Sequence, residues 1–168
     1  MLSLFILLFV IGLDQFTKIL TVNHFALYES LEIIPGFFNL TYLTNKGAAF
    51  GFLAGVDASW RHYFFLVLAS LALVLLLVAW FRLRKEHRFY GPALALIAGG
   101  AIGNVIDRVR LGAVVDFLDF YIAGHHWPAF NVADSAIFIG VAFFLLANFQ
   151  EERQKNGKEK DRTSNIEH

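Results

Sequence analysis

Residues 98–120, AGGAIGNVIDRVRLGAVVDFLDF, begin as a glycine-rich apolar run and end with three aspartates, Asp107, Asp116 and Asp119. The first half has the composition of a helix that crosses a bilayer. A carboxylate close to the hydrocarbon of a membrane is costly, so acids in such a place are functional candidates by default. The stretch therefore predicts a membrane protein with important acidic groups near one end of a helix.

The composition of the whole chain supports a membrane protein. Of its 168 residues, 57% are hydrophobic and 17% are charged, whereas soluble domains have about 45–50% apolar and about 25% charged residues. The formal net charge is zero, which gives no reason to expect a nucleic-acid partner. The chain has no cysteine, and this excludes disulfides, thiolate zinc sites and a cysteine nucleophile.

Four apolar runs are long enough to span a membrane, for which about 20 mainly apolar residues are needed. A cleaved signal peptide is the alternative for the first run, but the run lacks a basic start and a small-residue cleavage site. We therefore expect a retained helix there and a bundle of four transmembrane helices, mainly α. The expected helices cover residues 1–22, 64–81, 89–106 and 132–149.

The distribution of Lys and Arg predicts the orientation. The connection RLRKEHR at 82–88 holds four of them, and five more follow residue 149. Basic loops stay in the cytoplasm, so both termini are expected there and the loops at 23–63 and 107–131 outside. We expect one membrane domain over residues 1–150 and a polar cytoplasmic tail over 151–168.

The outer loops predict a small β-sheet on the extracytoplasmic side. Pro35-Gly36 is a turn signal and FFNLTYLT is rich in strand-forming residues, so a β-region is expected over about 31–53. We expect GAVVDFLDF, residues 112–120, to lie along the membrane surface as a rim segment. In the third run Ala95, Gly99 and Gly103 recur every four residues, a spacing that lets membrane helices pack closely.

Three charged residues at membrane depth have more than one interpretation. Asp14 and Lys18 stand four residues apart, so they share a helix face and are expected to form an internal ion pair that can also support a site. Arg108 follows the third run. It can cap and anchor that helix end, or hold a carboxylate or a carbonyl with its guanidinium.

Asp116 and Asp134 form the candidate catalytic pair. Alone, Asp134 or Asn131 is explained as the N-cap or first-turn acid of the fourth helix. Together, Asp116 and Asp134 are both expected at the outer rim. Two carboxylates about 3 Å apart share one proton, so one can activate water while the other polarises a carbonyl. The pair predicts peptide hydrolysis without a cofactor or a metal.

Other hydrolytic chemistries have less support. The chain has six histidines, but none lies in an H-E-x-x-H motif, so a zinc peptidase lacks its ligands. Ser135 is the one serine at a helix rim, and the spacing assigns no base to it.

The chain resembles the lipoprotein signal peptidases, also called signal peptidase II, over about residues 11–149. The resemblance rests on five segments in order between the four apolar runs. They are LDQFTK at 13–18, NLTYLTNKGAAFG at 39–51, GGAIGNVIDR at 99–108, GAVVDFLDF at 112–120 and FNVADSAI at 130–137.

The resemblance implies a bacterial inner-membrane aspartyl endopeptidase that removes signal peptides from diacylglyceryl-modified prolipoproteins, just before the lipidated cysteine. It implies Asp116 and Asp134 as the catalytic pair, with Asp107 and Asp119 outside it. It also implies inhibition by globomycin-type peptides. From the residues themselves we expect membrane lipid as a partner, and a monomer because nothing in the sequence demands more. The supporting motif residues would be Asp14, Lys18, Asn45, Gly47, Asn104, Arg108, Asn131 and Ala133. Asn45, Asn104, Arg108 and Asn131 would hold the substrate backbone and order the pair, while Asp14 and Lys18 would support the sheet and bundle.

Three other functions compete with this one. A presenilin-type protease would carry YD and GxGD motifs, which this sequence lacks. A small transporter or proton-conducting bundle would use Asp14, Lys18 and the rim acids, and would depend on Asp14 more than on Asp116. An inert membrane scaffold would depend on no acid beyond its stability.

Overall fold

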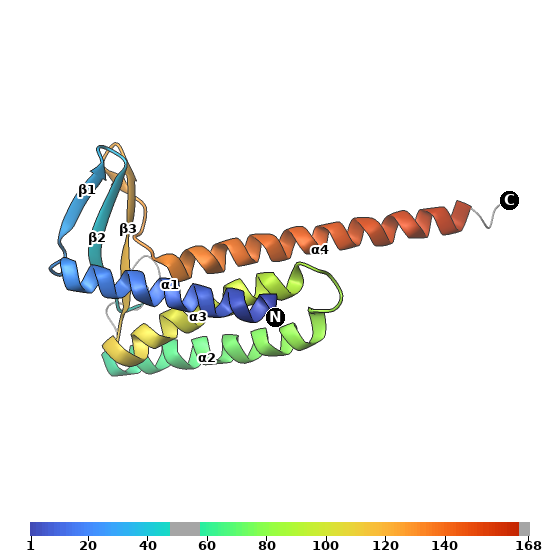
Figure 1. Ribbon diagram of the computed structural model, residues 1–168, viewed down its shortest axis with the longest axis horizontal. Helices are drawn as coiled ribbons and strands as arrows, with labels where there is room; N and C mark the ends of the chain where they lie inside the picture. Colours follow the sequence, from blue (N-terminus) through green and yellow to red (C-terminus); the bar gives the residue numbers. More distant parts are fainter. Residues whose placement is uncertain (48–57, 165–168) are drawn as a thin grey trace.

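The computed structural model describes residues 1–47 and 58–164 and has a bundle of long helices with a small sheet at one end (Figure 1). Four helices of the described part are long and apolar enough to cross a membrane, which confirms the predicted class. They are α1 (Leu2–His24), α2 (Ala58–Leu83), α3 (Tyr90–Leu111) and α4 (Val132–Ser164). The predicted β-region at 48–53 lies outside the described residues.

The helices extend beyond the apolar runs that predicted them. α2 begins at Ala58 instead of residue 64, and α3 continues past residue 106 to Leu111. α4 continues past residue 149 to Ser164. Hydropathy marks the lipid-facing part of a helix and misses polar turns outside it. The end of α3 is set by Gly112, whose φ of 71° ends the helix while its N–H donates to the Arg108 carbonyl.

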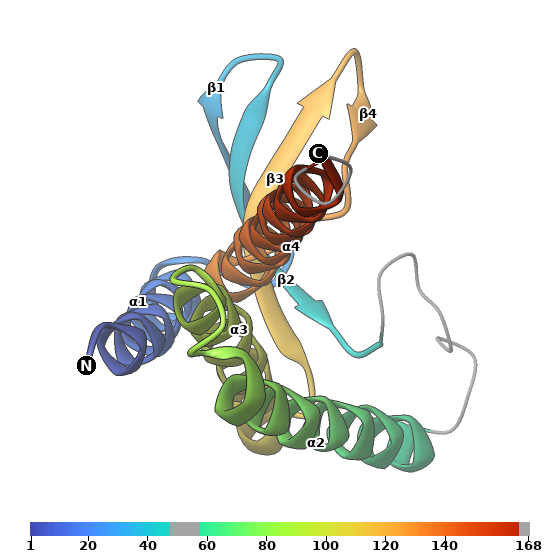
Figure 2. The ribbon, with the colours of Figure 1, turned by 90° about the vertical axis from the view of Figure 1, so that its right-hand side faces the viewer.

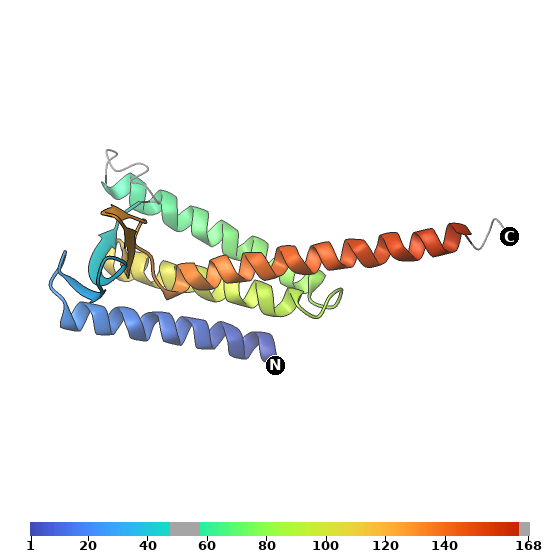
Figure 3. The same ribbon diagram turned by 90° about the horizontal axis from the view of Figure 1, so that it is seen from above.

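α3 lies at the centre of the bundle, with α1 and α2 on opposite sides of it and α4 packed along it (Figures 2 and 3). Its small residues allow this, as the four-residue spacing predicted. A Cβ on Gly99 would lie 3.0 Å from Val10 Cβ, and one on Gly103 would lie 2.5 Å from Asp14 Oδ2. Gly100 faces the Ala133 backbone of α4 in the same way. α1 and α4 therefore pack so closely on α3 that side chains at these glycine positions would collide with them.

The sheet is antiparallel, with strand order β1-β2-β3-β4. Its strands are β1 (Ser30–Ile34), β2 (Phe38–Asn45), β3 (Val114–Ile122) and β4 (His125–His126). Gly36, at the predicted turn between β1 and β2, has a φ of 74°.

The sheet includes one segment that was not predicted to be a strand. The expected rim segment at 112–120 is largely strand β3, which pairs with β2 so that Asp116 lies opposite Leu43. This pairing joins segments far apart in the sequence, so local pattern could not reveal it. The sheet thus carries one of the candidate aspartates to the end of the bundle.

Exposure along the helices is reversed relative to a soluble protein. Large apolar side chains such as Leu68 and Phe138 lie on the outside, Phe138 being 77% exposed. Charged residues lie inside, with Asp14 fully buried and Lys18 2% exposed. An apolar exterior suits lipid, and the buried charges mark the end of the bundle next to the sheet as the candidate site.

Candidate active site

Lys18 of α1 is the centre of a buried polar cluster. Its Nζ lies 2.9 Å from Asp14 Oδ2 and 2.8 Å from Asp107 Oδ2. It also donates to Asn104 Oδ1 at 3.0 Å. The ammonium group therefore uses its three protons on three acceptors from α1 and α3. The predicted Asp14–Lys18 ion pair is confirmed.

The participation of Asp107 and Gln15 in this cluster was not predicted. Gln15 Nε2 donates to Asp107 Oδ1 at 3.0 Å and to Asp14 Oδ2 at 3.2 Å. Asp107 Oδ2 also accepts the Val115 N–H of β3 at 3.1 Å. The available signal was the three-residue spacing of Asn104 and Asp107, which places both side chains on one face of α3.

Lys18 fixes the orientation of the Asn104 amide. An ammonium can only donate, so the amide oxygen must face Lys18 and the amide nitrogen must point away from it. That nitrogen donates to Asp134 Oδ1 at 2.8 Å. The buried charge of α1 thereby determines that Asp134 of α4 receives a donor.

Asn131 has two functions at the start of α4. Its Oδ1 accepts the Asp134 N–H at 2.9 Å, so it is the N-cap and Asp134 is a first-turn acid, as predicted. Its Nδ2 donates to Asp116 Oδ1 at 2.7 Å and to the Val115 carbonyl at 3.2 Å. The capping residue of α4 thus also binds the candidate aspartate of β3.

Asp116 is a buried acid with an altered pKa. Its exposure is 4%. Burial and the nearby charge of Asp134 raise the pKa of Asp116 from 3.8 to about 7, against the lowering effect of hydrogen bonds from Asn131 and Asn45. Asn45, at the end of β2, accepts the Gly47 N–H at 3.0 Å on its own Oδ1. The Asp116 carboxyl therefore keeps its proton to a higher pH than an ordinary aspartate does.

The backbone around Ala133 ties the two halves of the site together. The Ala133 N–H, one of the free donors at the start of α4, is bound by Asp14 Oδ1 at 2.9 Å. Ala133 is fully buried against Gly100 and Gly103 of α3. A larger residue at this position would separate α4 from α3.

Arg108 lies beside the acids at the last turn of α3. Its Nη1 donates to the Asn104 carbonyl at 3.3 Å, and its guanidinium carbon is 5.6 Å from the Phe65 ring centre. Its charge interacts with those of Asp134 and Asp116. Arg108 thus binds a carbonyl of its own helix near the end of α3, and its role in holding a carboxylate or a substrate carbonyl stays a prediction.

Asp119 lies in a separate group on the sheet. Its carboxylate accepts from Asn39 Nδ2 at 2.9 Å and lies 2.9 Å from His126 Nδ1. It contacts neither of the two asparagines that hold Asp116 and Asp134. Within residues 1–47 and 58–164, no group of three potential metal ligands is present.

The described side chains bring together two carboxyl groups, several amide donors and one cation. Asn104 and Asn131 connect Asp134 to Asp116, with Asn131 Nδ2 3.3 Å from Asn104 Oδ1. Such an arrangement suits general acid–base chemistry by a proton-sharing pair. Fold and site together define a multi-pass membrane protein with an acid pair at one end of its bundle.

The chain belongs to the signal peptidase II family, whose model, "Signal peptidase (SPase) II", matches residues 6–150. The family makes it an aspartic-type signal peptidase, a hydrolase of the membrane. It is 52% identical over 143 residues to the lipoprotein signal peptidase of Geobacter sulfurreducens, covering 85% of this chain and 88% of that one. It is 48% identical over 147 residues to that of Syntrophus aciditrophicus, covering 88% and 91%.

A solved structure agrees with this assignment. It is described as a bacterial membrane enzyme and superimposes with a TM-score of 0.81 at 37% identity, covering 91% of this chain and 90% of its own. Another, also described as a bacterial membrane enzyme, has a TM-score of 0.77 at 36% identity, with 86% and 90% covered. The predicted family and fold class are therefore confirmed.

Proposed function

We propose that this signal peptidase cleaves diacylglyceryl-modified prolipoproteins just before the lipidated cysteine, using Asp116 and Asp134 as its catalytic pair. The support is the hydrogen-bond network that ties these two acids together through Asn104 and Asn131. The names of the relatives give the substrate class. The sequence motifs around the two acids match those of the family.

We assign the part of the acid to Asp116, because its burial favours the protonated carboxyl. Its carboxyl holds the shared proton and donates it to the oxygen of the scissile carbonyl. Asp134 takes a proton from a water molecule, whose oxygen attacks the carbonyl carbon. Asp134 then passes that proton to the amide nitrogen as the C–N bond breaks, and Asp116 recovers its own from the collapsing diol. No cofactor and no metal takes part.

The remaining motif residues position these groups. Asn104 and Asn131 each hold one carboxylate oxygen. Asn45 binds Asp116 from the sheet side. Arg108 lies where it can bind a carbonyl of the extended substrate. Gly47 orients Asn45, and Ala133 lets α4 approach α3 closely.

The Lys and Arg distribution supports an orientation with both termini in the cytoplasm. The acid pair then lies at the outer leaflet of the bacterial inner membrane, where lipidated substrate arrives laterally and water arrives from outside. We assign residues 1–150 to the peptidase domain and 151–168 to a cytoplasmic tail. We further propose that the enzyme acts as a monomer and is blocked by globomycin-type peptides.

The transporter alternative loses support from the ion cluster. Asp14 accepts from Lys18 and from the Ala133 N–H, so its oxygens are occupied within the protein. A proton-conducting carboxylate needs access to a water path.

The test uses purified protein in nanodiscs and a diacylglyceryl-modified prolipoprotein, with cleavage followed by gel shift. Asp116→Asn and Asp134→Asn are expected to abolish cleavage while remaining folded. Asp119→Asn is the matched control on the same strand as Asp116 and is expected to keep its activity. Full activity of either dyad variant would refute the aspartyl mechanism. Loss of activity in Asp119→Asn, with full activity in Asp116→Asn, would move the catalytic acid from Asp116 to Asp119.

A further inference from the structure

We propose that a groove between α1 and α2 binds an acyl chain of an anionic phospholipid, with the lipid phosphate at the basic connection 82–88. The groove has a volume of about 460 Å³, within the range of roughly 300–1,000 Å³ typical of ligand pockets. It lies away from the acid pair and is not needed for the proposed hydrolysis.

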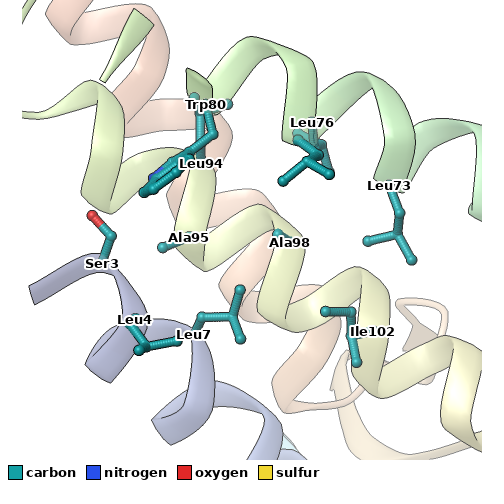
Figure 4. A pocket seen from close by; sticks show the side chains of 11 residues that line it. Ser3, Leu4, Leu7, Leu73, Leu76, Trp80, Leu94, Ala95, Ala98 and Ile102 are labelled. Carbon is teal, nitrogen blue, oxygen red and sulfur yellow. The ribbon is translucent and has the colours of Figure 1, made fainter. Parts of the chain in front are cut away.

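The groove is formed because α1 and α2 both pack on α3 from opposite sides. α3 provides its floor and the other two helices its walls (Figure 4). From Leu94 to Ile102 the floor runs for roughly 12 Å at 1.5 Å per residue. Apart from the Ser3 hydroxyl and the Trp80 indole nitrogen, the lining side chains carry no polar atom. These dimensions and this lining suit a hydrocarbon chain.

The end of the groove next to Ser3 and Trp80 carries positive charge. The Arg84 guanidinium carbon lies 4.0 Å from the Trp80 ring centre, so Arg84 is held at this end. A Cβ on Gly91 would lie 2.9 Å from Ser3 Oγ and 3.8 Å from Arg84 Cβ, so Ser3 and Arg84 both lie next to Gly91. A hydroxyl donor and a guanidinium together suit a phosphate.

The charge of the neighbouring connection favours an anionic lipid over a zwitterionic one. Residues 82–88, RLRKEHR, hold four basic residues and a single acid, Glu86. Each Lys or Arg near a membrane surface attracts anionic lipid by about 1 kcal/mol, equivalent to about fivefold.

The substrate's own acyl chains are a weaker candidate for this groove. Ser3 and Lys18 stand at opposite ends of α1, roughly 22 Å apart at 1.5 Å per residue. The site of hydrolysis lies at the Lys18 end, whereas the positive end of the groove lies beside Ser3. A chain anchored next to the scissile bond would enter the groove from its uncharged end.

The experiment uses Trp80 as a reporter, because it lines the groove. A Trp60→Phe/Trp127→Phe variant, in which Trp80 is the remaining tryptophan, is reconstituted in vesicles of phosphatidylcholine and phosphatidylglycerol. Either lipid is brominated at mid-chain, and quenching of Trp80 fluorescence is compared at equal mole fraction. We expect quenching to give a relative affinity about fivefold in favour of phosphatidylglycerol.

Two matched pairs of variants locate the lipid. Ala98→Phe fills the floor of the groove and should remove the preference, whereas Ala142→Phe, on the outer face of α4, should keep it. Arg84→Gln should reduce the relative affinity for phosphatidylglycerol over phosphatidylcholine towards one. Arg153→Gln removes an arginine in a similar contact, 4.8 Å from the Phe149 ring, and should leave the preference unchanged.

Three results would overturn the proposal. Equal quenching by the two brominated lipids would show that the site has no preference for an anionic headgroup. If Ala98→Phe and Ala142→Phe show the same lipid preference, the lipid does not bind in the groove. Displacement of the brominated lipid by a diacylglyceryl peptide assigns the groove to the substrate.

Discussion

Replacement of Lys18 by methionine tests whether the buried cluster is both a structural and a catalytic support. Methionine keeps the length of the side chain and removes its charge. Lys18 is 2% exposed and is bound by Asp14, Asp107 and Asn104. The variant therefore leaves two buried carboxylates without their cation, and it leaves the Asn104 oxygen without its donor.

The magnitude follows from the charge of the cluster. With Lys18 the cluster of one cation and two carboxylates carries −1, and without it −2. Breaking a buried ion pair by removing one partner costs roughly 3–5 kcal/mol. The Asn104 amide is then free to turn its oxygen towards Asp134. Misplacement of groups that position a reaction costs on the order of 10²-fold in rate.

The free energy of unfolding is measured from SDS titrations in mixed micelles, and cleavage is measured at equal amounts of folded protein. Lys18→Met should lose roughly 3–5 kcal/mol and on the order of 10²-fold in rate. A Lys18→Met/Asp107→Asn variant returns the cluster to −1 and should recover part of the stability. The recovered rate should be smaller, because Asn104 stays unanchored.

A stability of Lys18→Met within about 0.5 kcal/mol of the parent would contradict this reasoning, since surface changes have effects of that size. Equal stabilities of the single and double variants would show that the charge balance is not the cause.

Three further predictions concern packing, pH and the cap of α4. Gly100→Ala, whose new methyl group meets the Ala133 backbone, should lose roughly 1–3 kcal/mol of unfolding free energy, whereas Gly12→Ala, with open space, should gain up to about 1 kcal/mol. The pKa of Asp116 is raised from 3.8 to about 7, so the parent should lose stability relative to Asp116→Asn as pH rises from 4 to 7, by on the order of 4 kcal/mol, with no further change above. A constant difference over that range in thermal unfolding would argue against the raised value. Asn131→Asp keeps the helix-cap acceptor but cannot donate to Asp116 and puts a fully buried carboxylate beside it, so cleavage should fall on the order of 10²-fold and the melting temperature should fall as well.

The helical part of the fold was predictable because lipid imposes a simple rule. Each span must present about 20 apolar residues, and all four runs appear as helices. The helix ends were less predictable, since polar turns such as those after residue 106 lie outside the rule. β3 was missed because its partner β2 is distant in sequence, and no local period distinguishes a buried strand from an interfacial segment.

The candidate site was predictable in its members but not in its connections. Asp14 and Lys18 could be paired because helical spacing places them on one face. The contact of Asn104 with Lys18 crosses from α1 to α3, and the contact of Asn131 with Asp116 crosses from α4 to β3. Such contacts depend on how helices dock. Spacing showed that Asn104 and Asp107 share a face of α3 but not which helix that face meets, and so the contact of Asp107 with Lys18 was missed.

The dual use of Asn131 has a consequence for biosynthesis. α4 is synthesised after β3, and its first turn brings Asn131 and Asp134 together. Until that turn forms against β3, Asp116 has no donor from Asn131 and no second acid. In a nascent chain that has not reached residue 131, Asp116 therefore lacks a partner that the folded protein supplies, and the two acids come together only once α4 has begun to form on β3.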